Sequence, residues 1–182
     1  MRAVVQRVRR ASVTVAGSVT GQISGGLLVF VGVASDDGPA DVEYIVNKTR
    51  ELRIFPDEHG RMNRSVVESG GAVLVVSQFT LQADCRKGRR PSFDGAAPGP
   101  LARALYDDVV RRLRDGNLEV GTGVFQADMD VELVNDGPVT LLLDSRREFL
   151  SSQFAVSGFQ LPGRTPLHWQ LATGNWQLET DN

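Results

Sequence analysis

The sequence predicts an α+β fold of mostly antiparallel or mixed β-sheets with two main helices. Strand-like segments outnumber helix-like ones, and the helices do not alternate regularly with the strands, which argues against a doubly wound sheet. Residues 27–34 are apolar throughout, which is typical of a strand covered on both faces. A chain of 182 residues is long enough to bury a core without disulfides or metal.

The first strands are expected at residues 3–8, 12–15 and 19–23, where period-two alternation and β-branched residues dominate. Gly25 and Gly26 then separate the third of these strands from the apolar strand. An amphipathic helix follows an acidic start and Pro39, because apolar positions recur there at helical spacing, namely Val42, Ile45, Val46, Thr49 and Leu52.

A short strand is expected at residues 53–55, and an apolar strand at 72–76 follows Gly70 and Gly71. The second helix comes after Pro98 and Pro100, with one apolar face formed by Leu101, Ala104, Leu105, Val109 and Leu113. The last two strands are expected at residues 127–134 and 139–143. Between them, the run Asn-Asp-Gly-Pro at residues 135–138 indicates a hairpin turn.

The composition changes after Leu143, where scattered aromatic, Gly, Pro and polar residues show no sustained period. We therefore expect one domain over residues 1–144 and a C-terminal extension over residues 145–182, loosely docked or flexible.

Charge and cysteine content limit the function classes. The net charge is −2, so there is no global basic field, and any RNA contact must come from local patches. The single cysteine, Cys85, excludes an intramolecular disulfide and favours a reducing compartment. The N-terminal residues lack a continuous apolar segment, so a cytoplasmic protein without a membrane span is expected.

A polar cluster at the end of the strand at 72–76 is the first candidate for chemistry. Ser77, Gln78 and Thr80 precede a loop that carries Arg86, Lys87, Arg89 and Arg90. Alone, such a cluster is more often a strand end beside a solvated loop. His59 lies in an apparent turn, His168 lies in the extension, and Cys85 lacks a histidine base, so neither a metal nor a cofactor is expected.

Three segments in fixed order resemble the D-aminoacyl-tRNA deacylase family: QRV at residues 6–8, SQFTL at 77–81 with RPSF at 90–93, and NDGPVT at 135–140. The resemblance runs from Met1 to about Asp144 and includes ALYD, TGVF and ADM. It implies a homodimeric enzyme with its active site at the subunit interface. Its substrates would be D-aminoacyl-tRNA and mischarged glycyl-tRNA(Ala).

The resemblance also assigns roles to individual residues. The catalytic segment would be Ser77, Gln78, Phe79 and Thr80. Main-chain carbonyls of Gly137 and Pro138, from the other subunit in a cis arrangement, would bind the substrate. The remaining substrate-binding residues would be Arg7, which orients these carbonyls, Leu81 and Met129.

The residue types fit this chemistry, because hydrolysis of an activated ester needs a placed water and a stabilised oxyanion more than a strong nucleophile. The resemblance implies that the 2′-hydroxyl of the terminal adenosine assists the water. Thr80 as a covalent nucleophile is the second interpretation. Two further alternatives stay open, a related L-alanyl-tRNA editing deacylase and a non-catalytic tRNA-binding module. Charge favours phosphate contacts by the loop from Arg86 to Arg90.

Overall fold

The computed structural model describes residues 1–116, 118–147, 169–172 and 175–178, and the chain divides into two units, Met1–Glu148 and Phe149–Asn182. Within the second unit, β9 (Trp169–Ala172) pairs antiparallel with β10 (Asn175–Leu178). The rest of the expected extension beyond Arg147 lies outside the described residues.

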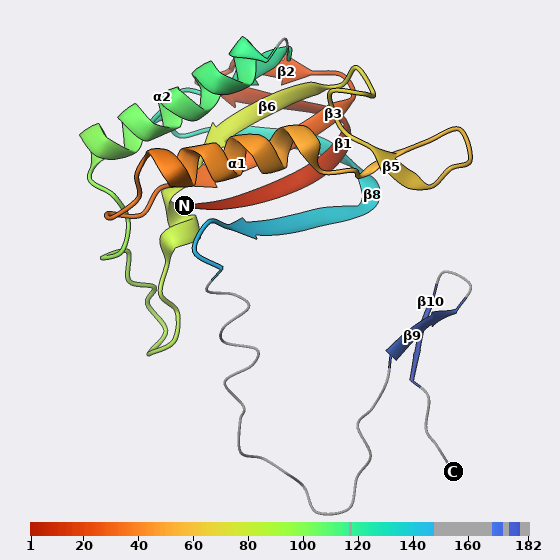
Figure 1. Ribbon diagram of the computed structural model, residues 1–182. Coiled ribbons are helices and arrows are strands. Elements are labelled where there is room, and N and C mark those ends of the chain that lie inside the picture. The colour runs from red at the N-terminus through yellow and green to blue at the C-terminus, as the bar shows by residue number, and fades with distance from the viewer. Residues whose placement is uncertain (117, 148–168, 173–174, 179–182) are drawn as a thin grey trace, which may run out of the picture. The chain divides into compact units, whose positions relative to one another are not determined.

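The first unit is built on a sheet in which the strands follow the order β2-β1-β3-β6-β7, with β8 on the other side of β1. β1 pairs antiparallel with β2, β3 and β8, whereas β3, β6 and β7 are parallel to one another (Figure 1). The α+β class with a mixed sheet is therefore confirmed. The strands span Arg2–Val15 (β1), Ser18–Ile23 (β2), Gly26–Gly32 (β3), Ala72–Ser77 (β6), Val120–Thr122 (β7) and Asp130–Asp144 (β8).

Both long strands differ from the expectation. β1 is one strand where two were expected, and β8 runs through residues 135–138, so the hairpin turn expected there is wrong. Gln6 pairs with Thr140 and Val8 with Asn135, which leaves Arg7 alone opposite residues 136–139. The turn-forming residues thus bulge out of a continuous strand pair, where a proline without an N–H is tolerated. The Gly137–Pro138 peptide is cis.

Two helices, α1 (Pro39–Glu51) and α2 (Gly99–Asp115), cover one face of the sheet (Figure 1). Among the described residues, no helix is long and apolar enough to cross a membrane. The helices pack on β3 and β6 because their apolar faces match the inward side chains of those strands. The fully buried members of this core include Leu27, Val29, Val42, Ile45, Val109 and Leu113.

On its opposite face, the sheet curls so that β2 comes close to β7 and covers the side chains between them. β2 approaches β7 so closely that a Cβ on Gly21 would lie 2.3 Å from the Thr122 carbonyl oxygen, which only glycine avoids. The second core lies inside this curl and contains Val13, Leu28, Leu74 and Val76. Burial on both faces explains why β3 and β6 are apolar throughout.

Several short elements were not predicted from the sequence pattern. β4 (Phe55–Pro56) lies close to the strand expected at residues 53–55, but β5 (Met62–Arg64), β7 and the 3-10 helix η1 (Phe79–Gln82) were not predicted. Elements of four residues or fewer are too short to show a period.

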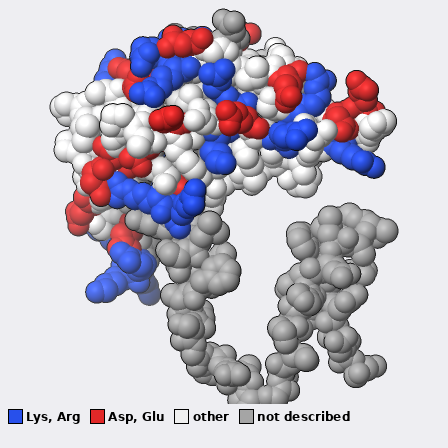
Figure 2. Space-filling model, viewed as in Figure 1, with Lys and Arg blue, Asp and Glu red and all other residues white. Residues whose placement is uncertain are grey.

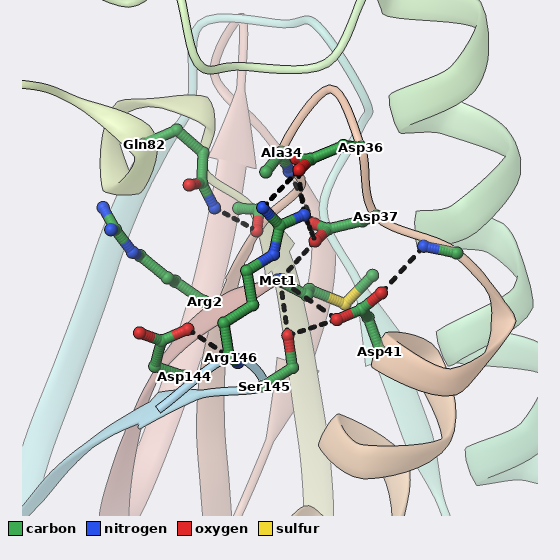
Figure 3. Close-up of polar contacts among 12 residues, drawn as sticks. Met1, Arg2, Ala34, Asp36, Asp37, Asp41, Gln82, Asp144, Ser145 and Arg146 are labelled. Carbon is green, nitrogen blue, oxygen red and sulfur yellow. Dashed lines mark hydrogen bonds and ion pairs between the residues drawn. The ribbon is translucent and has the colours of Figure 1, made fainter. Parts of the chain in front are cut away.

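A polar network joins the start of β1, the segment before α1 and the end of β8 (Figure 3). The α-ammonium group of Met1 lies 2.5 Å from Oδ1 of Asp37 and donates to Oγ of Ser145 across 2.7 Å. Arg146 donates to the carboxylates of Asp36 and Asp37. Ser145 and Arg146 were expected in the C-terminal extension, but in the structure both lie in the first unit and bind its residues.

Candidate active site

A cavity of about 600 Å³ opens where β6 ends. Ser77, Gln78 and Phe79 line it on one side, and Met129 lies on its wall just before β8. The structure thus brings four of the expected site residues to one cavity. The rest of the lining comes mainly from α2 and from the segment between β7 and β8, including Tyr106, Phe125, Gln126 and Asp128.

The end of β6 is fixed by the α2 residue Tyr106. Its buried hydroxyl donates to the Val75 carbonyl across 2.9 Å, two residues before Ser77. Burial raises the pKa of Tyr106 above its ordinary range, so the hydroxyl keeps its proton and stays a donor at neutral pH. This contact connects the polar end of β6 to α2.

The 3-10 helix η1 is anchored to β3 at both of its ends. The Gln78 N–H donates to the Val31 carbonyl across 2.8 Å. The buried Gln82 side-chain amide donates to the Gly32 carbonyl across 2.7 Å, and Figure 3 shows this amide. Gly32 allows this approach, because a Cβ there would lie 2.7 Å from the Gln78 carbonyl oxygen. The segment that was expected to be catalytic therefore rests directly on the backbone of a core strand.

Two main-chain donors are open at the start of η1. Among the described residues, neither the Phe79 nor the Thr80 N–H donates to a main-chain carbonyl, as is usual for the first N–H groups of a helix. Such donors beside a cavity are able to stabilise a developing oxyanion.

Thr80 and Leu81 do not line the cavity, although both belong to the SQFTL segment. The Thr80 hydroxyl accepts a hydrogen bond from the Gln78 amide across 2.5 Å, and Leu81 is half-buried with its carbonyl accepting from Arg2 across 3.2 Å. A 3-10 turn points successive side chains in different directions, so only part of the segment faces the cavity.

Arg7, Gly137 and Pro138 form a second group, at the bulge in β8. The Arg7 side chain, 11% exposed, donates to the Ile54 carbonyl, and its Nε lies 2.8 Å from Oδ2 of Asp136, an ion-pair distance outside hydrogen-bonding geometry. Arg7 thus holds the residue that directly precedes Gly137. Gly137 and Pro138 are both exposed.

The two groups do not meet within one chain. Ser77 pairs with Val31, Val31 with Ala3, and Ala3 with Leu143, so Ser77 and β8 are three strand spacings apart, about 14 Å. The bulge lies a further ~13 Å along β8 from Leu143. The strand register therefore keeps Gly137 and Pro138 away from Ser77 of the same chain.

Sequence reasoning missed several cavity residues, above all Asp128, which is the one carboxylate among the described lining residues. These residues could have been found, because Tyr106, Phe125 and Asp128 lie in the segments ALYD, TGVF and ADM. These segments were part of the family resemblance, but none of the three residues was predicted to line the site. In the described part of the chain, no group of three or more His, Cys, Asp or Glu residues is arranged to hold a metal ion. Cys85 is exposed.

The loop that carries Arg86, Lys87, Arg89 and Arg90, called the basic loop below, projects beyond η1. Two hydrogen bonds between the main chains of Asp84 and Ser92 close its base. Figure 2 shows Lys and Arg side chains at its tip. Arg86 is bound to Asp84 and lowers the pKa of that carboxyl. No ion pair among the described residues involves Lys87, Arg89 or Arg90, so three cations face solvent.

Comparisons with known proteins agree with this architecture. Residues 4–144 match the family described as D-Tyr-tRNA(Tyr) deacylase. Proteins named D-aminoacyl-tRNA deacylase from Syntrophobacter fumaroxidans and Anaeromyxobacter dehalogenans are each 62% identical over 149 residues, which is 82% of this chain and 100% of theirs.

Two solved structures share the fold. One titled "c-Myc DNA Unwinding Element Binding Protein" has a TM-score of 0.75 and 41% identity, over 79% of this chain and 98% of that chain. One titled as a probable eukaryotic D-amino acid tRNA deacylase has a TM-score of 0.66 and 19% identity over the same shares.

Proposed function

Because this chain belongs to the D-Tyr-tRNA(Tyr) deacylase family and is thus a hydrolase, we propose that it hydrolyses the ester between a D-amino acid and the terminal adenosine of tRNA. The observation that supports this most strongly is the cavity at the end of β6. It joins Ser77, Gln78 and the main chain of η1 in one place. A reaction on tRNA puts the protein in the cytoplasm.

Main-chain donors stabilise the transition state. When water attacks the ester carbonyl, the negative charge that develops on its oxygen is held mainly by the N–H group of Phe79, which lines the cavity. The N–H group of Thr80, the next residue of η1, is the second donor. These donors sit on an element that is bonded to β3 and need no reorganisation. One donor of this kind is typically worth about 3 kcal/mol of transition-state stabilisation.

The attacking water is activated by the substrate. The 2′-hydroxyl of the terminal adenosine lies next to the ester, and the described cavity lining holds no histidine and one carboxylate, Asp128. Thr80 as a nucleophile is disfavoured, because its hydroxyl accepts from an amide that cannot take up a proton.

A second subunit completes the site. The main-chain carbonyls of Gly137 and Pro138 of the partner subunit accept hydrogen bonds from the substrate ammonium group. Two features support this arrangement: these residues are exposed on the bulge, and the strand register keeps them away from Ser77 of their own chain. Arg7 holds the bulge through Asp136.

Chirality follows from this clamp. Once the ammonium and the ester are fixed, the side chain of a D-residue points to open space and that of an L-residue into the protein. Rejection by collision is strong, whereas attraction through a few methylene groups gives only about 1–3 kcal/mol. Glycine has no side chain to reject, so glycyl-tRNA is cleaved by the same geometry.

The basic loop contacts the tRNA phosphates through Lys87, Arg89 and Arg90. Removing one of these cations should reduce the salt dependence of tRNA affinity by about one unit of slope, because one phosphate is then no longer neutralised. Arg86 contributes less because Asp84 neutralises it. An unchanged salt slope in a variant with all three cations replaced by glutamine would contradict this role.

The direct test compares D-tyrosyl-tRNA, L-tyrosyl-tRNA and L-alanyl-tRNA incubated with purified protein. Selective loss of the D-ester is expected. Loss of the L-alanyl ester would favour the related editing activity instead. Binding of tRNA without cleavage of any ester would favour a non-catalytic binding module.

A further inference from the structure

Two exposed aromatic rings, Phe79 and Phe93, contact each other, and Phe79 lines the cavity. The centroids of Phe79 and Phe93 are 5.1 Å apart at an interplanar angle of 63°, an edge-to-face contact. Phe79 is 59% exposed and Phe93 is 37% exposed. The pair therefore presents apolar ring surface to solvent beside the catalytic segment.

Both rings are carried on anchored backbone. Phe79 begins η1, which is bonded to β3. The Phe93 carbonyl accepts from the Ala96 N–H across 2.9 Å, and Ala96 pairs with Ala34, two residues after the end of β3. The surface is consequently held in place before any ligand arrives, which reduces the entropy lost on binding.

The pair also lies between two features that the proposed function assigns to tRNA. Phe79 lines the cavity, whereas Phe93 follows the base of the basic loop at Ser92. Residues 84–94 carry four basic and two acidic residues, and one of the acids, Asp84, is bound to Arg86. A ligand that spans the cavity and the loop must cross these rings.

We propose that Phe79 and Phe93 form a stacking surface for the unpaired nucleotides that precede the terminal adenosine of tRNA. This rests on the proposed function, because the ester in the cavity sets the position of those nucleotides. Aromatic rings next to cations are the usual elements that bind single-stranded nucleic acid without sequence readout. The surplus of positive charge favours a polyanion over a second copy of this acidic chain as the occupant.

The test uses Phe93→Ala, since Phe79 also lines the cavity. D-Tyrosyl-tRNA and D-tyrosyl-adenosine are compared as substrates. The KM for the tRNA ester should rise about 5- to 150-fold, the range that corresponds to one stacked base, and the change should be confined to this longer substrate. Met62→Ala removes an apolar side chain from β5 that is more exposed than Phe93, and it should leave both reactions unchanged.

A second measurement needs no hydrolysis and so separates this proposal from the catalytic one. An acceptor-stem RNA minihelix carries 2-aminopurine next to its terminal adenosine, and its fluorescence should be quenched by the full chain but much less by the Phe93→Ala variant. Equal quenching by both proteins overturns the proposal, as does an equal loss on both esters. If the variant instead sediments as a smaller species than the parent, the rings are a subunit contact and the proposal is wrong.

Discussion

The Gln78 amide donates a hydrogen bond to the Thr80 hydroxyl across 2.5 Å, within the segment that follows β6. The bond gives the threonine oxygen a donor, and Thr80 does not line the cavity. Amide nitrogen is not a base, so this contact cannot activate the hydroxyl for attack. We therefore expect Thr80 to act through its main chain rather than through its hydroxyl.

Replacing Thr80 with valine should reduce kcat by less than about tenfold, because the Thr80 N–H remains in place. Single-turnover cleavage of D-tyrosyl-tRNA measures this directly. Removal of a true nucleophile typically costs about 10⁴-fold or more, and a loss of that size would restore the covalent interpretation.

Asp128→Asn should lower kcat by less than about threefold, because the 2′-hydroxyl of the substrate, rather than this carboxylate, assists the water. The corresponding 2′-deoxy ester should lose about 10²- to 10⁴-fold with the parent protein, the usual worth of general-base assistance. The reverse pattern would identify Asp128 as the base.

Gly32→Ala should impair catalysis more than folding. The new Cβ would meet the Gln78 carbonyl oxygen at 2.7 Å and push η1 away from β3, which displaces the oxyanion donors. A displacement of about 1 Å is enough to cost roughly 10²-fold in rate. Gly25→Ala is the matched control, since no atom lies within 4 Å of its added Cβ. Activity and thermal unfolding are compared for both, and equal activities would contradict the prediction.

Arg7 and Arg9 both contact the Asp136 carboxylate, but Arg7 is 11% exposed and Arg9 is 75% exposed. Arg7→Gln should lower kcat/KM for D-tyrosyl-tRNA by at least about tenfold, since removing one partner of a largely buried ion pair typically costs about 3–5 kcal/mol. Arg9→Gln should change it by less than about twofold because an exposed pair contributes little. Similar losses in both variants would remove the special role of Arg7.

Arg146→Gln should destabilise the first unit on the order of 1 kcal/mol at pH 7, because Arg146 donates to the buried Asp37. The hydrogen bond from Arg146 also lowers the pKa of Asp36. That contribution is present above the unfolded pKa, about 3.9, and is lost as the pH falls through the lower folded value. Urea unfolding should therefore show a smaller gap between variant and parent near pH 2.

Arg103→Gln is the matched control for this measurement. Its ion pair with Asp107 on α2 is exposed on both sides, and its loss should change the free energy of unfolding by less than about 0.5 kcal/mol. A gap for Arg146→Gln that is constant from pH 7 to pH 2 would contradict the contribution of Asp36.

Local pattern was sufficient for the two helices and for the buried strands β3 and β6. The apolar positions of α1 and α2 were found at helical spacing, and the runs at β3 and β6 were found as buried strands, since burial on both faces leaves a continuous apolar signal. β7 and η1 were not found because three or four residues carry no period.

The turn signal at residues 135–138 shows where local pattern fails. Gly137 and Pro138 have the same local preferences in a hairpin and in a bulge, and the choice depends on the pairing partner. β1 continues past this point and pairs with β8 on both sides of it, so the strand pair stays continuous and the turn residues bulge opposite Arg7.

The candidate site divides in the same way. The resemblance of the segments SQFTL and ADM to the family was enough to select Ser77, Gln78, Phe79 and Met129, which the fold brings to one cavity. No local segment of the sequence predicts that Arg7 and Gly137 lie far from that cavity. The same holds for the positions of Tyr106 and Asp128 in its wall. Both depend on strand order and register, which arise from pairing and packing between residues far apart in the chain.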